Sequence, residues 1–183
     1  MRLFGEKGYK GASITRIEAA SELSPGAGGL YRHFRSKEEL LAAGVQRHLG
    51  RLDALREVRE VFNDFGDLQE QLAITARYFL AELDSQTELL RFLVPERKQS
   101  PQLLSKAVDE LIAATYQGFA DWLRQVAGDT VNEDAATTIA NLALGSLLSS
   151  RLLRNVIGVK SLSIDDEAII PTWTLMIMGR LPR

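Results

Sequence analysis

Apolar side chains recur at spacings of three and four residues along almost the whole chain, which is the pattern of amphipathic α-helices. No segment of strand length alternates apolar and polar residues. Glycine, proline and short polar runs interrupt the helical pattern at intervals, and they predict where helices end. The pattern therefore predicts an all-α protein of about nine helices, without repeats or low-complexity tracts.

The expected helices fall into an amino-terminal group and a carboxy-terminal group. They are 1–7, 14–21, a short helix ending at 34, 37–61, 68–83, 88–94, 101–127, 135–156 and 164–181. Gly8 is expected to stop the first helix and Pro171 to kink the last. We divide the chain into a domain over residues 1–46 and a second domain over residues 47–183. The long helix that begins at residue 37 would join them.

Polar residues predict several helix starts. Ser13 is in position to cap the helix that begins at residue 14. Ser36 and Glu39 have the spacing of a capping box, and Thr130 and Glu133 have the same spacing farther along the chain.

Composition excludes several classes of protein and site. The chain has no cysteine, which excludes disulfides and thiolate metal sites and favours a reducing cytoplasm. No stretch of 18 apolar residues is present, so no membrane span is expected, and the first residues lack the apolar segment of a signal peptide. His33 and His48 are the only histidines, and Asp165 and Asp166 are expected at a helix start rather than at a metal. We therefore expect no metal, no cofactor and no enzymatic activity.

Charge is unevenly distributed along the chain. The net charge is −2, yet residues 1–50 hold eight Lys or Arg against five Asp or Glu, so this part carries +3 and the remainder −5. A basic head on an acidic body predicts that the head alone meets a polyanion.

The stretch GGLYRHFRSKEELL, residues 28–41, gives this head a specific chemistry. A short helix, a turn and a second short helix with nearby Arg and Lys are typical of a helix-turn-helix, whose second helix enters the DNA major groove. Tyr31 and His33 can bond phosphate oxygens, and Lys37 lies in the first turn of a helix, where backbone N–H groups also favour an anion. Leu30 and Phe34, four residues apart, share the face that holds the short helix onto the core.

Simpler roles remain open for these residues. Tyr31 as a core aromatic, His33 as a surface histidine and Lys37 as a solvated helix residue are the alternatives. The GAGG sequence lacks the preceding strand that a nucleotide-binding glycine loop requires.

Three motifs, LFGEKGY, SITRI and LSPGAGGLYRHFRSKEELL, resemble the amino-terminal domain of TetR-family transcriptional regulators. The resemblance spans Leu3 to Leu41. It implies a homodimer that binds a palindromic DNA operator and is released by a small-molecule effector. It also implies a small head core made by Ile17, Leu23, Leu30 and Phe34.

The resemblance assigns DNA binding to ten residues of the head. They are Ser13, Thr15, Arg16, Pro25, Gly26, Gly29, Tyr31, Arg32, His33 and Lys37.

Three departures from the family pattern affect the expected DNA contact. Glu22 brings a negative charge to the turn, and Ala27 and Gly28 are two extra residues before the expected recognition helix. The recognition segment is rich in glycine, which is unfavourable in a helix and leaves few side chains to read bases, so DNA shape is expected to carry more of the specificity. The first helix is shorter than is usual in the family, so we expect either that the true start of the protein lies upstream or that the present chain is a trimmed form.

Two further sets of residues are expected in the carboxy-terminal domain. Small residues at helical spacing in the segment 139–153 allow close approach of another helix. The resemblance implies that this helix and the last one form a dimer interface, which we assign to Ala140, Ala143, Leu144, Leu147, Ser150, Arg151, Trp173 and Ile177. Aromatic residues predict an effector pocket of Tyr78, Phe79, Phe92, Tyr116, Phe119 and Trp122. A plain buried core is the alternative for both sets.

The sequence therefore predicts a ligand-responsive, DNA-binding regulator, and we favour a repressor over an activator. The alternative is a helical dimer that binds a small molecule and has lost tight DNA binding. A helical enzyme is a third and weaker alternative.

Overall fold

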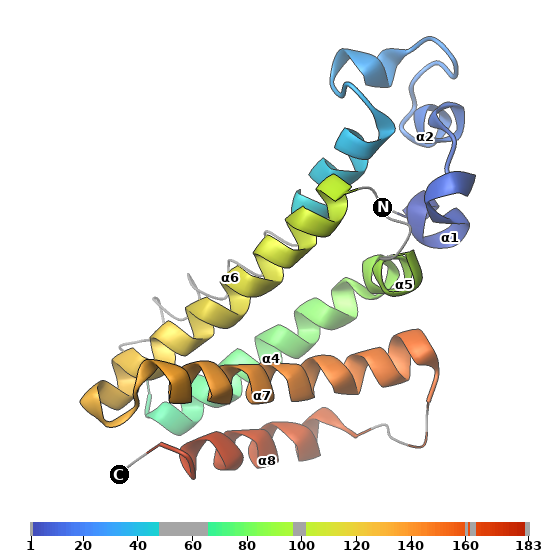
Figure 1. The fold of residues 1–183 in the computed structure, drawn as a ribbon. Helices are drawn as coiled ribbons and strands as arrows, with labels where there is room; N and C mark the ends of the chain where they lie inside the picture. Colours follow the sequence, from blue (N-terminus) through green and yellow to red (C-terminus); the bar gives the residue numbers. More distant parts are fainter. Residues whose placement is uncertain (1, 48–65, 97–101, 160, 162–163, 182–183) are drawn as a thin grey trace. The chain divides into compact units, whose positions relative to one another are not determined.

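The computed structural model describes residues 2–47, 66–96, 102–159, 161 and 164–181. Every regular element within these ranges is helical, which confirms the prediction of an all-α protein (Figure 1). The predicted end of the long helix near residue 61 lies outside the described residues. Within them, no helix has the length and apolar character needed to cross a bilayer.

The chain forms two compact units. One contains residues 1–49 and 86–110, and the other contains residues 50–85 and 111–183. The first unit therefore contains, besides the amino-terminal residues, helix α5 (Thr87–Glu96) and the beginning of α6 (Gln102–Ala127), which come much later in the sequence. The division at residue 46 remains a prediction.

The first unit is built around the packing of α1 (Arg2–Gly11) on α5. The ring of Phe4 lies 6.0 Å from that of Phe92, and both side chains are buried. A Cβ on Gly5 would approach the carbonyl oxygen of Glu88 to 3.1 Å, so glycine permits the close crossing. Gly8 interrupts α1 with φ 67° and ψ 175°, as the sequence predicts, but helical hydrogen bonding resumes and continues to Gly11.

The rest of the first unit is short. It comprises α2 (Ile14–Ala20), the 3₁₀ turn η1 (Gly29–Arg32) and the helix described over residues 37–47. Ile17, Leu30, Leu41 and Val45 supply the buried apolar positions of these elements.

The second unit packs α4 (Leu68–Ser85) against both α7 (Glu133–Arg151) and α8 (Asp166–Met178). Figure 1 shows α7 and α8 running side by side. The buried Trp173 side chain of α8 donates from Nε1 to the carbonyl oxygen of Ala143, 2.8 Å away. Its ring also lies 6.0 Å from Phe119 of α6, so one side chain links three helices. The 3₁₀ turn η2 (Gly128–Thr130) precedes α7, and the π-helix η3 (Leu152–Ile157) extends it.

Several helix ends differ from those predicted. Asn132, not Thr130, caps α7, because its side chain accepts the Ala135 N–H at 2.8 Å. The Thr130 hydroxyl instead donates to the Ala127 carbonyl oxygen. Helix α5 continues through Pro95 to Glu96, and α8 ends at Met178, three residues before the predicted end, with Pro171 inside it as expected.

A cluster of charges fixes the junction of α4, α7, η3 and α8. The guanidinium of Arg151 is almost fully buried, with 2% of the side chain exposed, and its Nη2 lies 2.6 Å from Asp166 Oδ1. Its Nε lies 2.9 Å from Asp84 Oδ1, without hydrogen-bond geometry. Arg154 and Asn155 donate to the same Asp84 oxygen at 3.1 and 2.9 Å. Since a buried cation is stable only when its charge is balanced, the ends of these elements are tied together.

We expect Asp84→Asn to lower the free energy of unfolding by about 2 kcal/mol, because buried Arg151 loses one of its two carboxylate partners. Glu110→Gln is the control, since the Lys106–Glu110 pair is exposed and spans 3.7 Å. Its loss should cost less than about 0.5 kcal/mol. Urea unfolding curves measure both, and equal losses would show that burial of Arg151 is unimportant.

Candidate nucleic-acid interface

Helix α2 begins at the surface of the first unit. Ser13 is exposed, and its hydroxyl oxygen accepts the Arg16 N–H at 3.4 Å, which confirms the predicted cap. Thr15 and Arg16 are also exposed, and the Arg16 guanidinium donates to the Gly11 carbonyl oxygen. The start of α2 therefore offers polar side chains to a partner in solution.

The segment expected to be a recognition helix is a single 3₁₀ turn, η1. Gly26 and Gly28, with φ of 79° and 69°, hold the preceding turn in the left-handed region, which ends the regular backbone that a longer helix would need. Glu22 also has a positive φ, 58°. The two extra residues therefore lengthen the turn and do not lengthen the helix.

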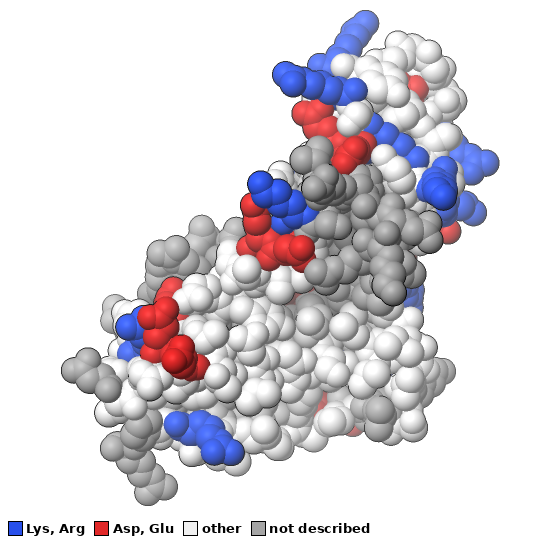
Figure 2. Space-filling view, in the orientation of Figure 1, with Lys and Arg blue, Asp and Glu red and all other residues white. Residues whose placement is uncertain are grey.

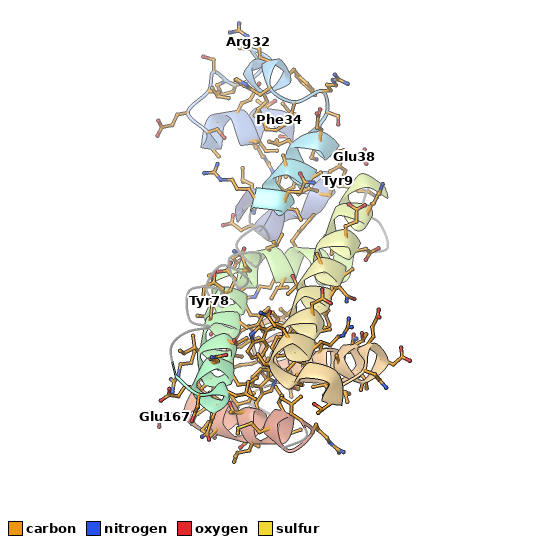
Figure 3. All side chains as sticks on the ribbon, turned by 90° about the vertical axis from the view of Figure 1, so that its left-hand side faces the viewer. Tyr9, Arg32, Phe34, Glu38, Tyr78 and Glu167 are labelled. Atoms are coloured by element: carbon orange, nitrogen blue, oxygen red, sulfur yellow. The ribbon has the colours of Figure 1, made fainter. Side chains whose placement is uncertain are left out.

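The side chains of η1 and of the two residues that follow it differ in exposure. Leu30 is buried, as the sequence predicts, whereas Phe34 is half-buried and Leu23, expected in the same core, is 37% exposed. Tyr31 is 56% exposed, and Arg32 and His33 are exposed. Figure 3 shows Arg32 at the outer edge of the head and Phe34 among its side chains. The predicted contact residues Pro25 and Gly26 are exposed, and Gly29 is half-buried.

Lys37 is held within the first unit in this structure. Its ammonium donates to the Tyr9 carbonyl oxygen and lies 4.4 Å from the centroid of the Tyr9 ring. Burial lowers the pKa of Lys37. Burial and, secondarily, the charge of Glu38 raise the pKa of Tyr9. Lys37 thus joins the end of α1 to the start of helix 37–47, and a phosphate would compete with Tyr9 for it.

The start of helix 37–47 has one of the two hydrogen bonds of the predicted capping box, and the other has a different partner. The Glu39 N–H donates to the Ser36 hydroxyl at 3.1 Å. The Glu39 carboxylate accepts from the Arg35 N–H, one residue earlier than the expected partner. Lys and Arg side chains project from several parts of the first unit (Figure 2). Arg32 and Arg35 are exposed.

Glu18 is a residue of the head that the sequence prediction missed. It is fully buried, and its carboxylate accepts the N–H groups of Gly26 at 2.7 Å and Leu30 at 3.4 Å. One signal for it was available, because Glu18 is four residues after Ile14 and next to Ile17, on the inward side of a short helix.

The predicted pocket residues are divided between the two units. Phe79, Phe119 and Trp122 are buried in the second unit, where the Phe119 and Trp122 rings lie 5.5 Å apart. Tyr78 and Tyr116 are half-buried, and burial raises the pKa of Tyr116. Phe92 belongs to the first unit, against Phe4.

The residues predicted for a dimer interface lie largely on the inner faces of their helices. Seven are buried within the protomer: Ala140, Ala143, Leu144, Leu147, Arg151, Trp173 and Ile177. Ser150 is half-buried. The outward side chains of the same helices include Leu142, Leu175 and Met176, which are 72%, 61% and 66% exposed.

Among the described residues, no group of three or more His, Asp or Glu is placed to hold a metal ion. Asp166 pairs with Arg151, and Asp165 occupies the N-cap position of α8 without a side-chain capping bond.

Comparison with known sequences matches residues 1–43 to the family described as bacterial regulatory proteins, tetR family. An HTH-type transcriptional regulator of Staphylococcus aureus (strain bovine RF122 / ET3-1) is 33% identical over 89 residues, covering 48% of this chain and 46% of its own. A regulator of the same type from strain USA300 is 33% identical over 79 residues, covering 43% and 40%. This chain therefore spans less than half the length of these curated relatives.

Solved structures extend the similarity in fold to the whole chain. The fatty acid degradation regulator FadR of Bacillus halodurans has a TM-score of 0.73 and 18% identity, over 99% of this chain and 95% of its own. The TetR-family transcriptional regulator PfmR of Thermus thermophilus has a TM-score of 0.65 and 23% identity, over 100% and 96%. At these identities the likeness concerns the fold.

We expect Ser13→Ala to destabilise the head by about 1 kcal/mol, because the first N–H groups of α2 lose their side-chain acceptor. Amide hydrogen exchange at Arg16 should accelerate. Ser21→Ala is the matched control at the other end of α2, where the cap bonds involve only backbone. Unchanged exchange at Arg16 in Ser13→Ala would contradict the capping role.

Proposed function

Because the chain belongs to the TetR family of bacterial regulatory proteins, we propose that it is a homodimeric repressor that a small-molecule effector releases from a palindromic DNA operator. A regulator of this family is not an enzyme, in agreement with the sequence prediction. The operator-binding surface is the exposed face formed by the start of α2 and by η1.

One observation carries the DNA-binding proposal. The polar side chains of Ser13, Tyr31, Arg32 and His33 are exposed on one small unit, while Leu30 between them is buried. Hydroxyl, guanidinium and imidazole groups suit phosphate oxygens. A buried anchor that fixes these groups at the surface is what a phosphate-binding face requires.

Dimerisation is proposed through the outward faces of α7 and α8. Three large apolar side chains, Leu142, Leu175 and Met176, are mostly exposed there. Gly145 of α7 has open space around it, so a partner helix can approach closely. Two heads are required because the half-sites of a palindrome lie about 34 Å apart, or a multiple of that distance.

Regulation is proposed as a shift between two populations. An effector bound within the helices of the carboxy-terminal domain (residues 47–183) would favour a dimer whose head spacing no longer fits the operator. The shift can be no larger than the difference in effector affinity between the two states. Tyr78, Phe79, Tyr116, Phe119 and Trp122 are the proposed aromatic residues of that site, and Phe92, which packs on Phe4 in the first unit, is left out of it. A cytoplasmic location is part of the same proposal.

The second candidate is a small-molecule-binding dimer without tight DNA binding. The brevity of η1 and the engagement of Lys37 by Tyr9 favour it. Direct measurement of DNA binding separates the two functions.

We expect the protein to select a specific duplex from a pool of random sequence, and fluorescence anisotropy should show affinity for it that falls as salt rises. Lys37→Ala and Tyr31→Ala should weaken binding, and Lys37→Ala should also reduce the salt slope by about one. Lys106→Ala, which removes an exposed cation elsewhere, is the control. No specific duplex at any salt concentration would favour the second candidate.

Met176→Asp should convert the dimer to a monomer, because it places a charge among the exposed apolar side chains of α7 and α8 that are proposed to meet the partner. Multi-angle light scattering gives the mass directly. Ile164→Asp is the control, since Ile164 is also exposed (49%) but precedes α8. A dimer that persists in Met176→Asp would place the interface elsewhere.

A further inference from the structure

Glu18 is a fully buried acidic residue of α2. It has no solvent-exposed surface, and its neighbours in the core of the head include Ile17 and Leu30. Burial of a carboxylate is costly unless hydrogen bonds balance the charge. An apolar side chain of similar size would satisfy packing alone, so the position requires another explanation.

The carboxylate accepts hydrogen bonds from both ends of the segment that precedes and begins η1. Gly26 N–H donates to Oε2 at 2.7 Å, and Leu30 N–H donates to Oε1 at 3.4 Å. The backbone carbonyl oxygen of the same residue accepts the N–H groups of Ser21 and Leu23 at 3.0 and 2.9 Å. One residue of α2 therefore holds the turn at four points.

This turn needs such an anchor more than an ordinary one does. Glu22, Gly26 and Gly28 all have positive φ, and glycine loses much conformational entropy when it is fixed. The two hydrogen bonds from this turn to the Glu18 carboxylate, at Gly26 and Leu30, lie on either side of the extra residues Ala27 and Gly28. Without these bonds, the position of η1 relative to α2 would depend mainly on Leu30.

We infer that Glu18 is the positioning residue of the DNA-reading segment, and that its carboxylate sets the placement of Tyr31, Arg32 and His33 relative to Ser13. This inference rests on the proposed function. Glu18 does not touch DNA; it acts through the backbone of Gly26 and Leu30. Its contribution is to specificity, because only a fixed η1 can discriminate between duplexes of different sequence or shape.

Two substitutions separate positioning from stability. Glu18→Gln keeps the shape but replaces one acceptor oxygen by an NH₂ donor that would face a backbone N–H. Glu18→Met fills a similar volume and removes both acceptors together with the buried charge, so the cost of two unpaired N–H groups is partly offset, and its thermal stability is measured alongside the other readouts. Glu22→Gln removes the same charge from an exposed residue of the same turn, and it is the matched control.

The first readout is hydrogen exchange at Gly26 and Leu30 in the DNA-free protein. We expect exchange to accelerate about tenfold or more in Glu18→Gln and Glu18→Met, because an amide bonded to a charged acceptor loses its partner. Glu22→Gln should exchange as the wild type does. Unchanged exchange in both Glu18 variants would overturn the inference without bearing on DNA binding.

The second readout is the ratio of affinities for the selected duplex and a scrambled duplex. We expect this ratio to fall about tenfold or more in both Glu18 variants, while Glu22→Gln stays within about twofold of the wild type. A merely structural role predicts that discrimination follows thermal stability, so a stable Glu18→Met that discriminates normally would overturn the inference. A wild-type protein that binds no duplex specifically would overturn the proposed function and this role with it, and the exchange data identify which part failed.

Discussion

The head of this molecule is too small to bury its own apolar side chains, and its packing against α5 is the constraint on which the first unit depends. Helix α2 has seven residues and η1 has four, which is little material for a stable core. Helix α1 therefore packs on α5, with Phe4 against Phe92 and Gly5 at the crossing. An element from the middle of the chain thereby completes a domain whose sequence motifs all lie within the first 41 residues.

Each unit contains a buried charged side chain, and the groups that balance its charge differ between the two units. In the second unit, Arg151 is balanced by carboxylates from α4 and α8, so charge joins helices that also meet through Trp173. In the first unit, Glu18 is balanced by backbone N–H groups of one turn. Each arrangement fixes the geometry of a junction that apolar packing alone leaves less defined, because hydrogen bonds and ion pairs depend on direction and distance.

The helical fold and the Ser13 cap were predictable from the sequence because both depend on local patterns. Helical periodicity survives any arrangement of the helices, and a cap is decided within one turn. The 3₁₀ form of η1 was not predicted, since it depends on the left-handed conformations of Gly26 and Gly28. The engagement of Lys37 by Tyr9 was also missed, because its partner is 28 residues away.

The small residues of α7 illustrate a further limit. Their spacing indicated a helix that packs closely, but periodicity does not state whether the neighbour is the same chain or a partner. The structure shows Ala140, Ala143 and Leu147 packed within the protomer. Phe92 presents the same difficulty: an aromatic residue at helical spacing belongs to whichever core its helix reaches, and α5 reaches the core of the head.

Because η1 has only four residues, it limits how the DNA preference of such a regulator can change during evolution. A recognition helix of several turns offers many side chains that point mutations can exchange, one base preference at a time. Within η1 only Tyr31 and Arg32 are exposed side chains, and the glycines before them have none to vary. After gene duplication, a new operator preference would therefore arise more readily through changes in the length of the turn than through successive substitutions in the helix.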